Sequence, residues 1–186
     1  MKRVIFDFDD TINDMLPRWV ALLNERYNLS VKVDNITDWD MSKAYPSLTH
    51  DQIYEPLRDP SYWQSVPCPE SVVHNIELLR DHGFEVLLAT STHPSDVSVK
   101  YRHCIKYFPF DRREIIFTYR KDILECDYIV DDYPPNLADN KGVRILIDAP
   151  YNQKGGTTNY AGMYDFRAAD MTEAVKIILA HEGVKV

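Results

Sequence analysis

Short apolar runs alternate with segments of helical periodicity along most of the chain. Five runs have the length and the β-branched or aromatic content of buried strands, namely the run that begins at Val4 and residues 84–89, 115–117, 128–130 and 143–147. Successive apolar positions of this kind are typical of parallel strands buried on both faces. Strands that alternate with helices pair in parallel through right-handed crossovers, so the pattern predicts a three-layer, doubly wound α/β fold with about five strands.

Four further segments place apolar residues at helical spacing. They cover residues 16–27, 70–81 and 94–107 and the stretch that begins at Asp170. His82-Gly83 predicts the end of the second segment, because glycine adopts the left-handed conformation that terminates many helices. The stretch Gly155–Thr158 is interpreted as a loop.

The stretch from about residue 29 to 69 differs in character, since it is aromatic and polar and is broken by turn signals. One short helix is predicted there after Ser47. We therefore expect residues 15–67 to form a small helical unit inserted after the first strand. Residues 1–14 and 68–186 are expected to form the α/β core.

Composition narrows the classes of function. The chain has 186 residues and a net charge of −8, which argues against binding to polymeric nucleic acid, because such binding depends on basic side chains that neutralise phosphates. No apolar run approaches the roughly 20 residues that span a bilayer, and the first residues show no signal-peptide pattern, so a cytoplasmic protein without membrane contact is expected. The three cysteines form no C-x-x-C pair and suggest neither zinc nor a disulfide framework.

Polar side chains follow three of the predicted strands at the point where each strand ends. The first strand is followed by acidic groups, the second by hydroxyl groups and the fourth by a pair of acidic groups: Asp7 and Asp9, Thr90 and Ser91, and Asp131 and Asp132. Parallel strands bring all these ends to one edge of the sheet, where ligands bind in open α/β folds. For the acidic residues after the first strand, taken alone, the simpler alternative is an acidic turn with no catalytic role.

Such a set of oxygen donors favours a hard cation. Mg²⁺ takes one or two carboxylates together with phosphate oxygens of a substrate, so the pattern points to phosphoryl transfer. Lys121 lies between the third and fourth predicted strands and is a candidate for contact with the phosphate and the nucleophile.

These residues resemble the motifs of the haloacid dehalogenase superfamily. Asp7-Phe8-Asp9-Asp10-Thr11 is similar to its first motif, Asp-x-Asp-x-Thr. Thr90 resembles the second motif, Lys121 the third and Asp131-Asp132 the fourth. Within the superfamily the chain looks like the 5'(3')-deoxyribonucleotidases. That likeness extends over Arg120–Asp132, Pro135–Leu137 and Ile147–Gln153, with a departure at Tyr133, where some relatives carry arginine.

The resemblance implies a role for each motif residue. Asp7 would be the nucleophile that forms an aspartyl-phosphate, and Asp9 would protonate the leaving oxygen and then activate water. Thr90, Ser91 and Lys121 would bind the phosphate. Mg²⁺ would be held by Asp7, by the backbone carbonyl of Asp9 and by one or both of Asp131 and Asp132. Asp10 is expected to turn away from the metal, and Thr11 to hydrogen-bond within the turn.

In this superfamily an insertion between the first two motifs is a cap over the site, and a small cap suits a small phosphorylated molecule. Tyr62 and Trp63 are the preferred candidates to stack on a nucleobase, and Trp39 is a further one. The alternative is that these aromatic side chains form the core of the cap itself.

The resemblance thus implies a Mg²⁺-dependent phosphatase that acts on nucleoside monophosphates. Two alternatives are compatible with the same residues. One is the same chemistry on a sugar phosphate or another small phosphometabolite, and the other is a protein that binds a phosphometabolite without turning it over. The preferred base and sugar, the position of the phosphate and a homodimeric state are left open by the sequence.

Overall fold

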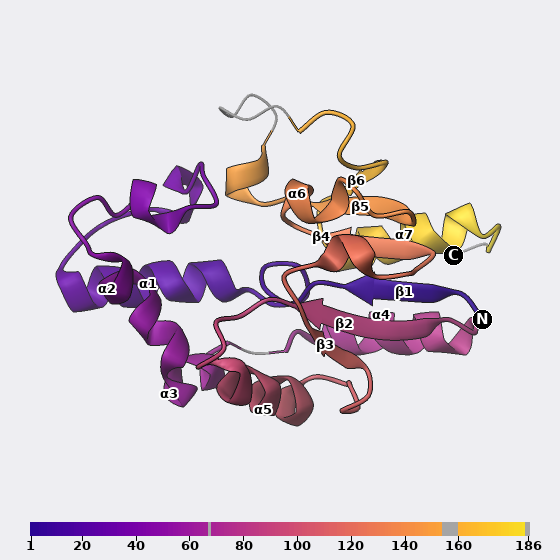
Figure 1. Cartoon of the computed structure of the whole chain (residues 1–186), viewed down its shortest axis with the longest axis horizontal. Coiled ribbons are helices and arrows are strands. Elements are labelled where there is room, and N and C mark those ends of the chain that lie inside the picture. Colours follow the sequence, from indigo (N-terminus) through magenta and orange to yellow (C-terminus); the bar gives the residue numbers. More distant parts are fainter. Residues whose placement is uncertain (67, 154–159, 185–186) are drawn as a thin grey trace.

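The computed structural model describes residues 1–66, 68–153 and 160–184, so the stretch Gly155–Thr158 lies outside the described residues. Its centre is a parallel six-stranded sheet in the order β3-β2-β1-β4-β5-β6 (Figure 1). The strands are β1 Arg3–Phe6, β2 Glu85–Thr90, β3 Ile115–Phe117, β4 Tyr128–Asp131, β5 Val143–Ile147 and β6 Phe166–Ala168. The predicted three-layer α/β fold is confirmed.

The sixth strand was not among the five predicted. β6 contains only three residues and pairs with β5 at one edge of the sheet. Its partly exposed Phe166 and Arg167 give no apolar run that a sequence pattern could reveal. An ion pair between Arg144 and Asp165, at 2.7 Å, anchors the residue that precedes the strand. Tertiary contacts therefore define this strand, as is usual for a short edge strand.

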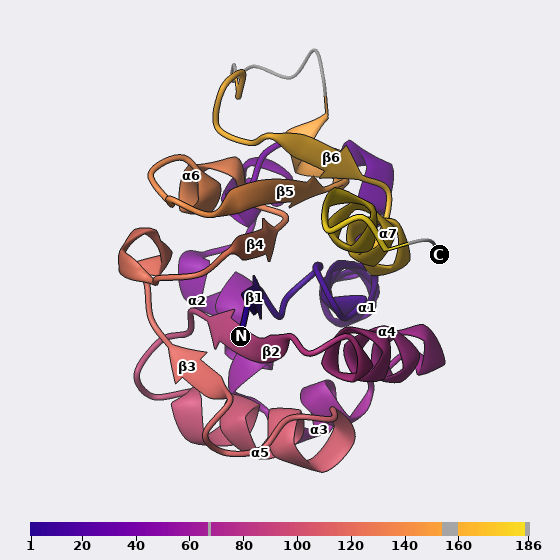
Figure 2. The same ribbon diagram turned by 90° about the vertical axis from the view of Figure 1, so that its right-hand side faces the viewer.

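Helices cover both faces of the sheet. The longer ones are α1 Met15–Tyr27, α4 Glu70–Asp81, α5 Val97–Tyr107 and α7 Met171–His181, and the four-residue α6 spans Pro134–Leu137. Figure 2 shows α4 and α7 side by side on one face and α6 on the other. α4 ends where predicted, because Gly83 adopts a left-handed φ of 80° just after it.

The first and fourth apolar runs form the central strands β1 and β4, whose side chains are buried in the core. The side chains of Val4, Phe6, Tyr128 and Val130 are fully or almost fully buried in the main apolar cluster, which continues into α4 and α7. A smaller cluster under α6 contains Ile129 and two leucines. β1 and β4 are thus buried on both faces, as continuous apolar runs in parallel sheets require.

A helical segment lies beyond the carboxyl ends of the strands (Figure 1). It contains α2 His50–Tyr54, α3 Pro60–Gln64 and the 3-10 helices Val33–Asn35, Met41–Lys43 and Glu55–Arg58, and α1 runs into it from the sheet. The indole nitrogen of Trp19 on α1 donates a 2.8 Å hydrogen bond to the carbonyl of Ile53. The boundaries proposed for the helical unit, residues 15–67, stay a prediction. Within the described residues, no helix has both the length and the apolar character to cross a membrane.

We expect Gly142→Ala to destabilise the fold, because the turn before β5 passes very close to the start of β4. A Cβ atom at this position would lie 2.7 Å from the carbonyl oxygen of Cys126 and 3.0 Å from that of Asp127. Overpacking of this kind costs about 1–3 kcal/mol, which chemical unfolding measures directly. The neighbouring Lys141→Ala at an exposed site is the control, with an expected change within about 0.5 kcal/mol. Equal stability of both variants would contradict the interpretation.

Candidate active site

Three acidic side chains converge where β1 and β4 end. The backbone N–H of Asp7 donates a 2.8 Å hydrogen bond to the carbonyl of Val130, which fixes the residue after β1 against the end of β4. Carboxylate oxygens of Asp7, Asp131 and Asp132 consequently lie within 4.8 Å of one another, and all three residues are buried. The structure thus brings together three of the residues that the sequence pattern singled out.

Lys121 lies between two of these carboxylates. Its Nζ atom is 2.6 Å from Oδ1 of Asp7 and 2.6 Å from Oδ2 of Asp131. The lysine begins a short 3-10 helix, Lys121–Ile123, and its carbonyl accepts a 3.0 Å hydrogen bond from the side chain of Asn140. Burial alone would lower the pKa of Lys121, but the two carboxylates outweigh that effect and raise the pKa above its usual range. The lysine therefore stays charged.

Asp131 and Asp132 have different surroundings. Asp131 accepts hydrogen bonds from the backbone N–H of Tyr133 at 2.8 Å and from Asn136, in addition to its bond with Lys121. Asp132 accepts hydrogen bonds from two hydroxyl groups, those of Tyr151 and Thr11. Asp132 also lines a large cavity, whereas Asp131 does not. Asp131 thus anchors the lysine, and Asp132 presents its carboxylate to the cavity.

The cluster carries more buried negative charge than the lysine balances. Burial raises the pKa of Asp131 to about 6, although Lys121 opposes this, and burial together with Asp131 raises that of Asp132 well above its usual range. Raised values of this kind mean that ionisation lacks a compensating cation. The donors are all carboxylate oxygens, which suits a hard divalent cation such as Mg²⁺. The residues present therefore fit the Mg²⁺ ion that the resemblance in sequence implies.

Asp9, two residues after Asp7, has a cationic partner of its own. Its Oδ2 atom forms an ion pair with Lys100 of α5, while its Oδ1 atom is buried and has no hydrogen-bond partner among the described residues. Burial raises the pKa of Asp9, against the lowering effect of Lys100. A carboxyl group with a raised pKa is suited to hold and release a proton.

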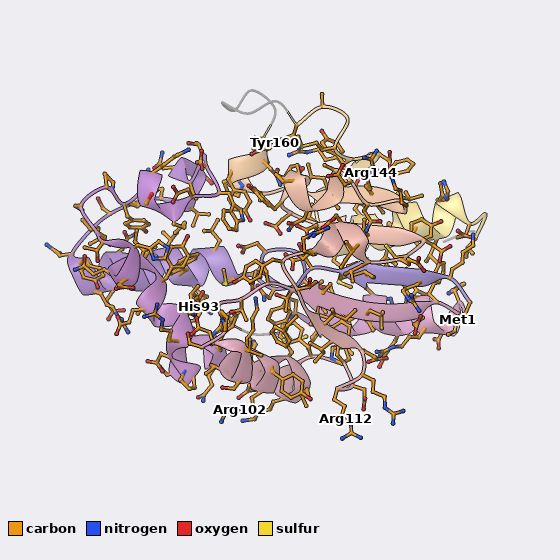
Figure 3. The ribbon with its side chains drawn as sticks, viewed as in Figure 1. Met1, His93, Arg102, Arg112, Arg144 and Tyr160 are labelled. Atoms are coloured by element: carbon orange, nitrogen blue, oxygen red, sulfur yellow. The ribbon has the colours of Figure 1, made fainter. Side chains whose placement is uncertain are left out.

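The end of β2 supplies the hydroxyl groups. Thr90 is fully buried, and its Oγ1 atom has no hydrogen-bond partner among the described residues. Ser91 lines the cavity beside Asp9. An unpartnered buried hydroxyl costs free energy unless a ligand satisfies it, so this loop suits an oxyanion. His93 from the same loop lies at the junction between the sheet and the helical segment (Figure 3).

The two residues after Asp9 shape the turn into α1. Asp10 adopts a left-handed φ of 52°, and its Oδ1 accepts a 2.7 Å hydrogen bond from the N–H of Leu16 at the start of the helix. Burial raises the pKa of Asp10 to about 8. Thr11 does not bond within the turn as expected but donates to Oδ1 of Asp132 at 3.1 Å. The turn is therefore tied to the end of β4, a contact between residues far apart in sequence.

A cavity of about 400 Å³ with an aromatic outer wall has Asp7, Asp9, Ser91 and Asp132 in its lining. Thr90, Lys121 and Asp131 are buried and do not line it. Trp63 and Trp39 both line it, the first deeply buried and the second half-exposed. The ring of Trp39 stacks on Tyr133 with a centroid distance of 4.7 Å. Tyr62 does not reach the cavity, because its ring packs inside the helical segment and its hydroxyl donates to the carbonyl of Met15 at 3.0 Å. Of the three aromatic candidates, two are at the site.

Sequence reasoning missed Lys100 and Tyr151. Lys100 occupies the buried face of α5, four residues before the buried Cys104. A lysine at a core position of an amphipathic helix is unusual, and this pattern in the sequence could have indicated Lys100 as a functional residue. Tyr151 is brought to Asp132 by a short 3-10 helix after β5, where the Nδ2 atom of Asn152 also donates to the carbonyl of Asp132 at 2.6 Å. No local pattern indicates that contact.

The parallel sheet with acidic groups at adjacent strand ends and a lysine between them is the arrangement that the motifs resembling the haloacid dehalogenase superfamily predict. Structural comparison agrees on the fold. A hydrolase of this superfamily from Deinococcus radiodurans R1, with bound phosphate and sodium, has a TM-score of 0.62 at 11% identity and covers 100% of this chain and 98% of that chain. A family IA, variant 3 hydrolase from Entamoeba histolytica has a TM-score of 0.57 at 15% identity, covering 96% and 99%.

Sequence comparison defines the family more narrowly. The profile of the family described as 5' nucleotidase, deoxy (pyrimidine), cytosolic type C protein matches residues 1–181, and the chain belongs to this family. The 5'(3')-deoxyribonucleotidases of Bacillus subtilis strain 168 and of Bacillus phage SPbeta are each 30% identical over 156 residues, which is 82% of this chain and 89% of each relative. The sequence-based expectation of this family is confirmed.

We expect Lys121→Met to destabilise the protein, because it leaves the buried Asp7 and Asp131 carboxylates without their shared cation. Removal of one partner from a buried charge cluster costs about 3–5 kcal/mol, which urea unfolding at neutral pH would reveal. Arg120→Met is the matched control at the adjacent position, since Arg120 is exposed and its guanidinium pairs with Asp122 at the surface. A loss below about 1 kcal/mol for Lys121→Met would contradict the assigned role.

Proposed function

We propose that this chain hydrolyses nucleoside monophosphates, with a deoxyribonucleoside 5'- or 3'-phosphate as the expected substrate class. The observation that carries the proposal is the buried group of Asp7, Lys121 and Asp132 beneath an aromatic-walled cavity of about 400 Å³. Membership of the nucleotidase family and the similarity to the Bacillus 5'(3')-deoxyribonucleotidases support the substrate class.

The first half of the proposed reaction transfers the phosphoryl group to Asp7. A carboxylate oxygen of Asp7 attacks phosphorus in line, and the bond between phosphorus and the nucleoside oxygen breaks. The departing oxygen takes the proton of Asp9. Thr90 and Ser91 donate hydrogen bonds to the phosphoryl oxygens, and the charge of Lys121 favours the attack by its contact with Asp7.

The second half releases phosphate and restores both carboxyl groups. Water attacks phosphorus of the aspartyl-phosphate and gives a proton to Asp9, while the bond to Asp7 breaks. Asp9 thus ends the cycle protonated, as it began. Two displacements replace a single direct attack by water, and each uses a group that the strand ends already hold in position.

Mg²⁺ is the proposed cofactor. Asp7, the backbone carbonyl of Asp9 and Asp132 would hold it, because Asp132 lines the cavity while Asp131 is engaged with Lys121. When bound, the metal would neutralise phosphate charge and polarise the phosphoryl group.

The helical segment, residues 15–67, is proposed to act as a cap that admits small substrates. Trp63 and Trp39 offer faces on which a base can stack, and Tyr62 supports the segment from within. A cavity of this size suits a mononucleotide better than a phosphoprotein or a nucleic-acid polymer.

The direct test is phosphate release across the deoxyribo- and ribonucleoside 5'- and 3'-monophosphates, with Mg²⁺ and with a chelator. We expect turnover that requires Mg²⁺, and we expect Asp7→Asn to lower kcat by about 10³-fold or more, since the nucleophile is lost. Asp122→Asn is the control at a partly exposed position, where Asp122 pairs with Arg120, and it should keep full activity. Substantial turnover by Asp7→Asn would exclude the aspartyl-phosphate mechanism. Preference for a sugar phosphate would keep the chemistry and reject the substrate, and inactivity on every phosphomonoester would favour a binding protein.

Trp39→Ala should weaken the binding of nucleotides selectively. Base stacking on an aromatic side chain is worth about 1–3 kcal/mol, so KM for a nucleoside monophosphate should rise about 5- to 150-fold with kcat little changed. Trp39→Phe keeps a stacking face and should retain most of the affinity. Steady-state kinetics on a nucleotide and on a phosphate ester without a ring system make the comparison, since only the nucleotide should be affected. An equal rise in KM for both substrates would count against a base contact.

A further inference from the structure

Lys100 is a buried cation at the active site that the motif residues do not explain. It belongs to α5, and only 1% of its surface is exposed. Arg102, two residues later on the same helix, lies on the outer side of α5 in Figure 3. A lysine ammonium is rarely buried to this degree unless it is paired, because desolvation of the charge is costly. The helix therefore directs one particular lysine inward.

The contacts of Lys100 lead to one carboxylate. Its Nζ atom donates to Oδ2 of Asp9 and, at 3.0 Å, to the carbonyl oxygen of Ser91. The same atom lies 5.6 Å from the ring centroid of Phe8 and 5.5 Å from that of Trp63. Two hydrogen bonds and two aromatic faces hold the ammonium in place, so it has little freedom to move.

The two lysines of the site have separate partners. Lys121 contacts Asp7 and Asp131, whereas Lys100 contacts Asp9. The bond from Lys100 leaves the two oxygens of Asp9 unequal. Oδ2 is engaged, and Oδ1 is buried without a hydrogen-bond partner among the described residues. Such an orphaned oxygen in an active site indicates a partner that arrives with the substrate or with water.

We propose that Lys100 is a positioning residue for Asp9, which holds Oδ2 in a fixed hydrogen bond so that Oδ1 is the oxygen that exchanges the proton. In the first step Oδ1 gives its proton to the departing nucleoside oxygen as the bond to phosphorus breaks, and in the second step Oδ1 takes a proton from the attacking water. This inference rests on the proposed function.

The test compares two matched substrates. One is a nucleoside 5'-monophosphate, whose alkoxide leaving group needs a proton, and the other is the corresponding 5'-S-phosphorothiolate, whose thiolate leaves without one. The ratio kcat/KM reports the steps up to departure of the nucleoside. General acid catalysis contributes about 10²–10⁴-fold, so Lys100→Met should lower kcat/KM for the oxygen ester by about 10²-fold and for the thiolate by less than about threefold.

Two further variants separate positioning from structural support. Lys100→Arg keeps a cationic donor and should recover part of the loss on the oxygen ester. Lys100→Met added to Asp9→Asn should cause little further loss, because the group to be positioned is already absent. Lys106→Met is the matched control on the exposed side of the same helix and should behave as the unaltered protein.

The outcomes are distinct. Equal losses on both substrates would show that Lys100 supports phosphate binding or folding instead, and independent losses in the double variant would also overturn the inference. If the unaltered protein releases no phosphate from any nucleoside monophosphate, the proposed function fails, and with it the basis of the inference. If it turns over nucleotides while Lys100→Met behaves like Lys106→Met, only the role of Lys100 is rejected.

Discussion

The ion pairs of Lys121 are the interaction on which the site depends. One ammonium group 2.6 Å from Asp7 and 2.6 Å from Asp131 joins the ends of β1 and β4, two strands whose sequences lie more than a hundred residues apart. Without that charge, the buried carboxylates would repel one another in a region that water screens poorly. The requirement for compensation also explains why the cluster fits a divalent cation, since one lysine is not enough for three carboxylates.

The topology of the sheet places the ends of β1 and β4 next to each other. The order β3-β2-β1-β4-β5-β6 places the first strand between the second and the fourth, so the groups after β1 have hydroxyls on one side and carboxylates on the other. This is the point where the order of the strands changes direction, and ligands of open α/β sheets bind at such a point. The hydrogen bond from the backbone N–H of Asp7 to the carbonyl of Val130 sets the alignment of the ends of β1 and β4. The fold therefore determines which residues meet, and the side chains determine the chemistry.

The sequence predicted the parts of the structure that depend on local patterns. Apolar runs identified five of the six strands, and the polar residues after them identified Asp7, Asp9 and the acidic pair of β4, because strand ends in a parallel sheet share one edge. β6 escaped prediction because its three residues are defined by pairing with β5. Lys100 and Tyr151 escaped because their roles arise from contacts across the fold, which no local spacing encodes.

The aromatic residues also show that local patterns in the sequence do not determine which side chains reach the site. A Tyr-Trp pair at adjacent positions of a helix must direct its two rings differently, since neighbouring side chains on a helix are about 100° apart. Trp63 accordingly reaches the cavity, while Tyr62 packs inside the helical segment. Composition identified the segment as aromatic, and only the three-dimensional packing decides which ring is available to a ligand.

The stacked pair of Trp39 and Tyr133 constrains how a base enters. Its ring centroids lie 4.7 Å apart, and Trp39 comes from the helical segment while Tyr133 follows β4. A third ring sandwiched between them would need a separation of about 7 Å, twice the closest carbon–carbon contact of about 3.5 Å. A nucleobase must therefore stack against the outside of the pair or separate it. Separation requires either a rotation of the half-exposed Trp39 side chain or a movement of the helical segment away from the sheet, so this one contact would couple the stacking of a base to the conformation of that segment.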